Sequence, residues 1–180
     1  MSQPERLGIF GGTFDPPHIG HLILAAEAHQ QLRLDRVFFV LSAEPPHKRD
    51  RKITPVKHRL AMLKLAIGDQ DQFEISRVEI DRPGPHFALD SIRQFSQDFL
   101  ESELVYLIGG DSLRDLSSWN KPSELLELIT TLGVMRRPFT DLKLGKLFEQ
   151  LPILEEKLDF INTPLLEISS RELRRKASRG

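Results

Sequence analysis

The sequence predicts an α/β fold in which a doubly wound, mostly parallel sheet carries helices on both of its faces. Three observations lead to this prediction. Short apolar runs alternate along the chain with longer segments whose apolar residues recur every three or four positions. The strongest apolar runs are continuous, as in strands that are covered on both sides. No repeat, linker or low-complexity tract interrupts the 180 residues, so we expect a single domain spanning 1–180.

The strands are expected at the apolar runs. Arg36–Leu41 (RVFFVL) and Leu104–Ile108 (LVYLI) are the clearest, because both are almost wholly apolar. The segment 73–80 alternates between apolar and polar residues, and the sequence RPGP at 82–85 breaks the chain after it. The complete set of expected strands is 7–10, 36–41, 73–80, 104–108, 131–135 and 158–161.

The segments between these strands carry the period of a helix. From Ile19, apolar residues at 19, 22, 23 and 26 fall on one face. Thr54 and Pro55 are expected to be the N-cap and the first residue of the next helix. The remaining helices are expected over 88–99, 112–116, 122–129, 141–151 and 169–177. Strands joined by helices in this order pack as a Rossmann-like, parallel sheet.

Composition excludes several classes of protein. With 39% hydrophobic and 28% charged residues, the chain is neither disordered nor a membrane protein in character. A net charge of −1 argues against a general nucleic-acid binder. The absence of cysteine excludes disulfides, thiolate metal sites and a cysteine nucleophile. The N-terminus lacks the long apolar run of a secretory signal, and no run approaches the ~20 residues of a membrane span. We therefore expect a cytoplasmic protein without a nucleic-acid or membrane partner.

Unusual residues follow the expected strands. In a doubly wound sheet, ligands bind beyond the carboxyl ends of the strands, where the strand order switches. The first strand is followed by GGTFDPPHIGH at 11–21, the second by His47 and Lys48, the third by 82–86, and the fourth by Asp111. The sequence therefore predicts one ligand site at this edge.

The stretch 11–21 has the chemistry of an anion site. Gly11 and Gly12 permit a tight turn and close approach of a ligand to the main chain. The helix that follows presents unpaired N–H groups at its start. His18 and His21 are three residues apart and should project from the same side of its first turn. A polyphosphate would suit this set of donors.

Two other interpretations of His18 and His21 stay open at this point. They could be two polar surface residues near a helix start. They could also bind a metal, although no third ligand is obvious and the glutamate of a His-Glu-x-x-His site is missing. The stretch matches neither the Gly-x-x-x-x-Gly-Lys phosphate loop nor Gly-x-Gly-x-x-Gly, so a bound NAD cofactor is not implied.

A family resemblance extends these observations. The residues 13–21 (TFDPPHIGH) resemble the signature of the nucleotidylyltransferase superfamily, His-x-Gly-His, and with 11–12 they are similar to the bacterial nicotinate-nucleotide adenylyltransferase family. Further similar pieces occur in the same order: PPHK at 45–48, LIGGD at 107–111 with Leu116 and Trp119 downstream, and ISSRELR at 168–174. The resemblance covers about 8–174.

The resemblance implies transfer of an adenylyl group from ATP to nicotinate mononucleotide. The nucleophile is a phosphate oxygen, which is already anionic, so no general base is needed. By resemblance, His18 and His21 bind the ATP phosphates, with His21 nearest the α-phosphate. Ser169, Ser170 and Arg174 bind the β- and γ-phosphates, and we expect His18, His21 and Arg174 to be the catalytic residues. A solvated charge is the alternative for Arg174.

The remaining ATP contacts are expected along the first and fourth strands. Gly11, Gly12, Thr13 and Phe14 would form the loop around the nucleotide. Asp111 would lie near the ATP ribose hydroxyls, with Gly109 permitting close approach; a purely structural turn aspartate is the alternative. The resemblance implies Mg²⁺ with the ATP substrate, and we expect no metal site built by the protein alone.

The mononucleotide site is expected at four residues. By resemblance, Trp119 stacks on the pyridine ring, and the alternative is a core tryptophan. His47 and Lys48 would meet the mononucleotide phosphate, or else form a solvated loop. Ala88 stands where the family usually has a threonine that helps to bind the nicotinate carboxylate. Backbone N–H groups would then supply the remaining contacts.

Three departures leave rival functions open. Besides Ala88, Arg171 replaces the usual threonine of the Ser-Ser-Thr box, and the chain stops at Gly180, sooner than is usual for the family. The rivals are an adenylyltransferase for nicotinamide mononucleotide or phosphopantetheine, and a nucleotide-binding regulator without turnover. A homo-oligomer is also left open.

Overall fold

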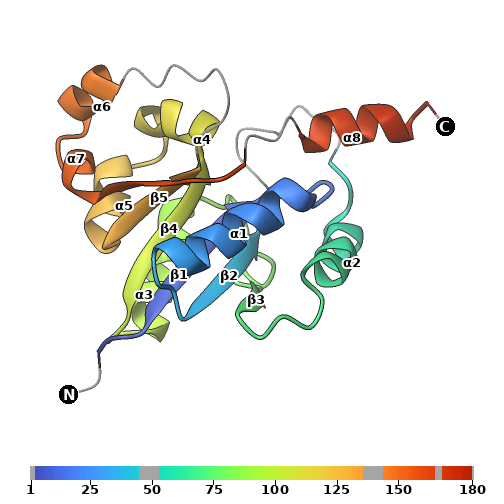
Figure 1. Ribbon diagram of the computed structural model, residues 1–180, viewed down its shortest axis with the longest axis horizontal. Helices are drawn as coiled ribbons and strands as arrows, with labels where there is room; N and C mark the ends of the chain where they lie inside the picture. Colours follow the sequence, from blue (N-terminus) through green and yellow to red (C-terminus); the bar gives the residue numbers. More distant parts are fainter. Residues whose placement is uncertain (1–2, 45–52, 136–143, 165–167, 180) are drawn as a thin grey trace.

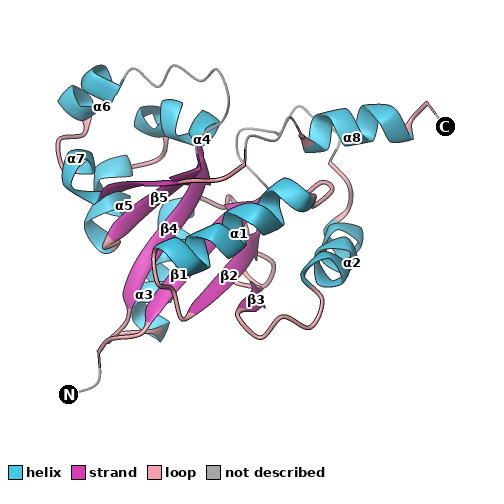
Figure 2. Cartoon of the chain, viewed as in Figure 1, coloured by secondary structure: helices cyan, strands magenta, loops and turns pink. Residues whose placement is uncertain are grey.

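A computed structural model of the chain describes residues 3–44, 53–135, 144–164 and 168–179. In these residues a six-stranded sheet has the order β3-β2-β1-β4-β5-β6, and every pairing is parallel. The strands are β1 (Arg6–Gly12), β2 (Arg36–Leu41), β3 (Phe73–Ser76), β4 (Glu103–Gly109), β5 (Thr131–Met135) and β6 (Leu158–Ile161). The prediction of an α/β, doubly wound parallel sheet is confirmed (Figures 1 and 2).

Helices connect consecutive strands. They are α1 (Ile19–Gln31), α2 (Val56–Ile67), α3 (Ala88–Asp98), α4 (Gly110–Arg114), the 3₁₀ helix η2 (Leu116–Ser118), α5 (Pro122–Leu128), α6 (Leu144–Gln150), α7 (Leu154–Lys157) and α8 (Ser170–Ala177). Of the helix expected over 141–151, the first three residues lie outside the described part of the chain, and the rest ends at Gln150. The short helix α7 was not predicted. Within the described ranges, no helix is both long and apolar enough to cross a membrane.

The core has one cluster on each face of the sheet. Ile9 of β1 packs with Leu89 of α3 and Leu125 of α5, whereas the next residue, Phe10, packs with Leu24 of α1 and Leu63 of α2. This alternation is the period of two that places successive side chains on opposite faces. Both faces are therefore covered, which explains why the strands are continuous apolar runs.

The strand expected over 73–80 is wrong in its second half. β3 ends at Ser76, and the chain then turns, with the Ile80 N–H donating to the Arg77 carbonyl at 2.8 Å. An ion pair of 2.6 Å between Arg77 and Asp81 spans this turn. The apolar positions change phase, from 73 and 75 to 78 and 80, and this change is the signal that the strand does not continue.

The start of α2 also differs from the prediction. The N-cap is Pro55 and the helix begins at Val56, so Thr54 is not the cap. Instead, two hydrogen bonds of its main-chain groups hold Thr54 just before the helix. Its N–H donates to Asp15 Oδ2 at 3.3 Å, and its carbonyl accepts from Arg59 Nε at 2.7 Å. These bonds attach the beginning of α2 to the loop after β1.

Candidate active site

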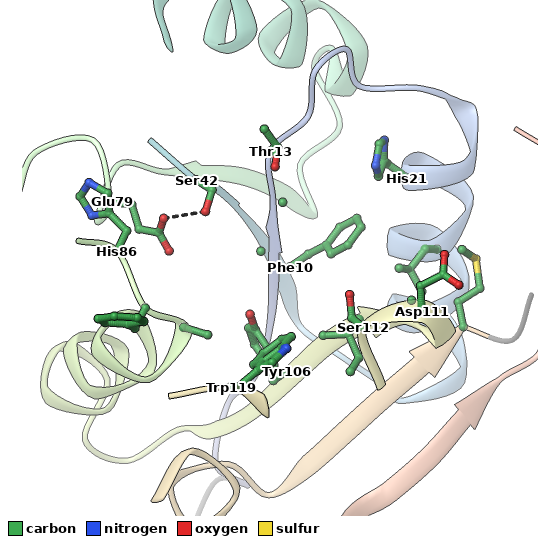
Figure 3. Close-up of a pocket in the computed structure, with 18 of the residues that line it drawn as sticks. Phe10, Thr13, His21, Ser42, Glu79, His86, Tyr106, Asp111, Ser112 and Trp119 are labelled. Atoms are coloured by element: carbon green, nitrogen blue, oxygen red, sulfur yellow. Dashed lines mark hydrogen bonds between the residues drawn. The ribbon is translucent and has the colours of Figure 1, made fainter. Parts of the chain in front are cut away.

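A pocket of about 380 Å³ opens at the carboxyl edge of the sheet. It lies over β1 and β4, where the strand order switches from β2 on one side to β5 on the other. Of the residues expected in the site, those that line it are Gly11, Gly12, Thr13, His18, His21, Ala88, Gly109, Asp111 and Trp119. Figure 3 shows His21 and Asp111 at one end of the pocket and His86 at the other. His47 and Lys48 lie outside the described residues.

The His18–His21 pair is built by the start of α1. His18 is the N-cap, and its N–H donates to His21 Nδ1 at 3.1 Å. The two imidazole rings are stacked, with centroids 3.7 Å apart and planes at 22°. Because Nδ1 of His21 is the acceptor, Nε2 carries the proton of the neutral ring and is its donor. Both rings line the pocket.

Aromatic rings behind His21 fix its orientation. Phe10 and Phe14 lie 5.9 and 5.0 Å from the His21 ring, centroid to centroid. Phe14 is only 2% exposed and is not among the pocket-lining residues, so the structure places it behind the histidine. A β-carbon on Gly12 would come within 2.7 Å of the Phe14 ring. Gly12 therefore allows Phe14 to pack where it supports His21.

The second expected helix start adjoins the first. Ser169 caps α8, accepting a hydrogen bond from the Glu172 N–H at 3.2 Å. Ser170 Oγ donates to the Pro16 carbonyl at 2.8 Å, and Arg174 donates to the Asp15 carbonyl. The α8 start is thereby docked on the loop that leads into α1. Ser169, Ser170 and Arg174 are not among the pocket-lining residues; they lie beside the loop that forms its wall.

Arg59 joins the walls of the pocket from inside the protein. Its side chain is 1% exposed and donates to four carbonyls, those of Thr13, Ser42, Ala43 and Thr54, at 2.7 to 3.1 Å. Burial lowers the pKa of Arg59, and the charge of Asp15 partly opposes this shift. The bonds connect the loop after β1 to the loop after β2.

One side of the pocket is formed where β4 runs into α4. Gly109 is the N-cap of α4, and a β-carbon there would meet no atom within 4 Å. Asp111 lies in the first turn of α4 and lines the pocket with Ser112. In Figure 3 both side chains lie on the side of the pocket nearer His21 than His86. The structure thus brings Asp111 and the histidine pair to one end.

The opposite end lies at the start of α3. Phe87 is the N-cap of α3, Ala88 is its first residue, and both line the pocket with His86. Trp119 follows η2 and meets Tyr106 of β4 edge to face, with ring centroids 6.2 Å apart and an interplanar angle of 81°. Trp119 thus packs against the core cluster with one part of its ring system and lines the pocket with another.

A buried carboxylate lies beneath this second end. Glu79 is 5% exposed, and it accepts hydrogen bonds from Ser42 Oγ at 2.9 Å and Ser91 Oγ at 2.8 Å. Ser91 Oγ in turn accepts from Arg82 Nη2 at 3.2 Å. No arginine or lysine is among the described residues that line the pocket. The second end therefore has a carboxylate beneath it and no arginine or lysine among its described lining residues.

Comparison with known proteins shows to which family the chain belongs. The family model described as cytidylyltransferase-like matches residues 9–176. A Thermomicrobium roseum protein named probable nicotinate-nucleotide adenylyltransferase is 43% identical over 176 residues, covering 98% of this chain and 82% of that protein. A Thermus thermophilus protein of the same name is 39% identical, covering 97% of this chain and 88% of that protein. The chain belongs to the nicotinate-nucleotide adenylyltransferase family.

Solved structures agree on the fold. The Plasmodium falciparum nicotinic acid mononucleotide adenylyltransferase complexed with NaAD superposes with a TM-score of 0.78 at 19% identity. The match covers 95% of this chain and 83% of that one. The same protein complexed with APC gives a TM-score of 0.76. The resemblance seen in the motifs is thus confirmed for the family, and the Rossmann-like architecture is confirmed by structure.

Sequence reasoning missed several pocket residues in this adenylyltransferase family member. Glu79, Tyr106 and Ser112 are among the lining residues that were not expected in the site, whereas His86 ends the segment 82–86 that was expected at this edge. For Glu79 a signal existed, because it follows the phase change in the run 73–80 and stands alone as an acid between Val78 and Ile80. Tyr106 lies within the apolar strand LVYLI, so the sequence pattern predicts a core residue at this position.

Proposed function

We infer that this chain transfers the adenylyl group of ATP to nicotinate mononucleotide, which gives nicotinate adenine dinucleotide and pyrophosphate in NAD biosynthesis. One observation carries the inference: a single pocket is lined by the His18–His21 pair and, away from His21, by the aromatic ring of Trp119 (Figure 3). Relatives near 40% identity over almost the whole chain bear the name of this activity. We place the enzyme in the cytoplasm.

The reaction needs positioning and charge stabilisation rather than a protein nucleophile. The attacking phosphate oxygen of the mononucleotide is already anionic near neutral pH, so no base must remove a proton. Catalysis then depends on holding two anionic reactants in line and on stabilising charge on the α-phosphate and the departing pyrophosphate. A pocket with separate ends and donors between them meets this requirement.

His21 and His18 are the groups we assign to the ATP phosphates. The orientation of His21 is fixed by the bond from the His18 N–H and by Phe10 and Phe14 behind it. A fixed donor costs little reorganisation when charge develops in the transition state. The N-terminus of α1, a helix of 13 residues, adds its positive dipole end at the same place.

Arg174, with Ser169 and Ser170, is assigned to the β- and γ-phosphates. The start of α8 is held next to the start of α1 by the Ser170–Pro16 bond. Arg174 is also 3.9 Å from Asp15 Oδ2 and 46% exposed, so its guanidinium keeps donors for a phosphate outside the protein contact. The ribose of ATP is assigned to Asp111 and Gly109.

The acidic residues present suit a metal ion that arrives with the nucleotide. Among the described residues, no group of three or more histidines, cysteines, aspartates or glutamates could hold an ion. Mg²⁺ usually keeps several waters and binds through substrate phosphates rather than in a cage made by the protein alone. Mg²⁺ carried by ATP would neutralise charge on the pyrophosphate.

The test is product formation by the unmodified chain. With ATP and nicotinate mononucleotide we expect pyrophosphate and the dinucleotide in equal amounts. Nicotinamide mononucleotide in a parallel assay measures the preference for acid or amide, which Ala88 leaves open. Binding of both substrates without release of pyrophosphate would contradict the proposal and favour a regulator.

A further inference from the structure

Tyr106 presents a polar group in an otherwise apolar part of the pocket. The residue lies in the middle of β4, opposite Ile9 of β1, and its ring belongs to the core cluster on the α3 and α5 face. It is only 6% exposed, yet it lines the pocket. A β-carbon on Gly11 would lie 2.9 Å from the Tyr106 hydroxyl oxygen, so that oxygen reaches the carboxyl edge beside the glycine loop.

The hydroxyl is available to a ligand. In the ranges that the structure describes, no hydrogen bond is made by Tyr106 Oη, and the close-up shows this oxygen projecting from the floor beside Trp119 (Figure 3). Burial, with a contribution from the negative charge of Glu79, raises the pKa of Tyr106 above its ordinary value. The group is therefore a neutral O–H donor near neutral pH. Buried hydroxyls normally have a partner, and here a ligand can supply it.

The position of Tyr106 relative to Trp119 favours the mononucleotide as its partner. Its ring is on the sheet face of Trp119 and Leu89, whereas the rings behind His21 belong to the cluster with α1 and α2. Glu79 is close enough to act on its pKa, and it lies at the end of the pocket with Ala88. A neutral O–H donor beside Trp119 suits an oxygen acceptor of a ligand that stacks against that ring.

We propose that Tyr106 Oη donates a hydrogen bond to an oxygen of the mononucleotide and contributes to its recognition. This proposal rests on the proposed function. The acceptor is either the carboxylate of the pyridine ring or an oxygen of the ribose phosphate. We assign no contact with ATP to this hydroxyl. Gly11 leaves room for this hydroxyl, because a side chain at that position would displace Tyr106 Oη.

The experiment uses Tyr106→Phe, which keeps the buried ring and removes only the hydroxyl. The chain has a single tryptophan, so its fluorescence reports binding of nicotinate mononucleotide without turnover. We expect Kd and KM for the mononucleotide to rise about fivefold, as for loss of one neutral hydrogen bond, with KM for ATP unchanged. A larger loss for the acid than for the amide mononucleotide identifies the carboxylate as acceptor, and an equal loss identifies the ribose phosphate.

Thr130→Val is the matched control. Thr130 Oγ1 donates to the carbonyl of Leu104 at 3.1 Å, near the start of β4 and therefore at the end of that strand away from the pocket. Loss of this hydroxyl should leave both KM values unchanged. An unchanged mononucleotide Kd in Tyr106→Phe, or an equal rise in KM for ATP, would overturn the proposal while wild-type pyrophosphate release still supports the function. Absence of that release in the wild type would overturn the proposed function, and this inference with it.

Discussion

The two ends of the pocket are built in different ways. The end that we assign to ATP comes largely from one continuous stretch, 11–21, in which the loop, the helix start and both histidines follow one another. The end that we assign to the mononucleotide is assembled from segments far apart in the chain, among them Ser42, Glu79, Ala88, Tyr106 and Trp119. Within 11–21 the turn, the helix start and the histidines are positioned by one another, whereas the residues of the second end come from separate elements. Substrate preference should therefore depend on the second end, and turnover on the first.

The largest expected effect is at Arg59, the residue that joins the two ends. Arg59→Met leaves four carbonyls without their donor. We expect the free energy of unfolding to fall by about 3 kcal/mol, measured by chemical denaturation. KM should rise for both substrates. Lys57→Met, at an exposed position of the same helix, is the control. Equal stability of the two variants would show that the ends are not held together by this arginine.

A smaller effect, confined to KM for the mononucleotide, is expected when Trp119 is replaced. Trp119→Leu removes the aromatic wall, and we expect KM for the mononucleotide to rise about tenfold, as for loss of one stacking contact. KM for ATP should stay within about twofold, because the tryptophan is not at the end that His21 forms. Trp119→Phe should recover part of the loss. If steady-state kinetics instead show a rise in KM for ATP, the division of the pocket is wrong.

Ala88→Thr sharpens the comparison within the mononucleotide end. Threonine at the first position of α3 would add a hydroxyl donor to the pocket wall. We expect the ratio of kcat/KM for acid over amide mononucleotide to rise by about threefold, since one added neutral hydrogen bond contributes about 1 kcal/mol or less. Ala26→Thr, at an exposed position of α1, should leave the ratio unchanged. A ratio that is the same in both variants would contradict this assignment.

The smallest effect is expected at Glu124, where substitution should change stability but not substrate binding. Hydrogen bonding to Lys121, with further contributions from Arg93, lowers the pKa of Glu124. A lowered folded-state pKa stabilises the protein above the ordinary glutamate range, and this contribution disappears as pH falls through the folded value. Glu124→Gln should therefore lower Tm slightly at neutral pH and not in acid, with both KM values unchanged.

Glu127→Gln, on the same helix, is the comparison for this variant. Added salt should reduce the Glu124 effect, because the ion pairs are exposed to solvent. A Tm difference that persists in acid would contradict the electrostatic explanation.

The fold and the grouping of Gly11, His18 and His21 in one pocket could be predicted because their signals are local. The runs RVFFVL and LVYLI specify buried strands by themselves, and the stretch 11–21 carries its own turn, cap and histidines. The docking of α8 beside α1 was also expected, and the Ser170–Pro16 bond shows the contact. Glu79 and Tyr106 could not be predicted in the same way. Their roles depend on the turn after β3 and on the parallel register of β4 with β1, which arise only when the chain is folded.

His21→Ala tests the central claim most directly, since that claim assigns charge stabilisation in the transition state to a histidine fixed by its neighbours. We predict that pyrophosphate release falls at least ~100-fold in kcat, equivalent to about 2.7 kcal/mol, while the exposed His58→Ala variant retains wild-type rates. A variant whose kcat is unchanged and whose KM for ATP alone rises would contradict the account, because His21 would then bind ATP equally in the ground and transition states.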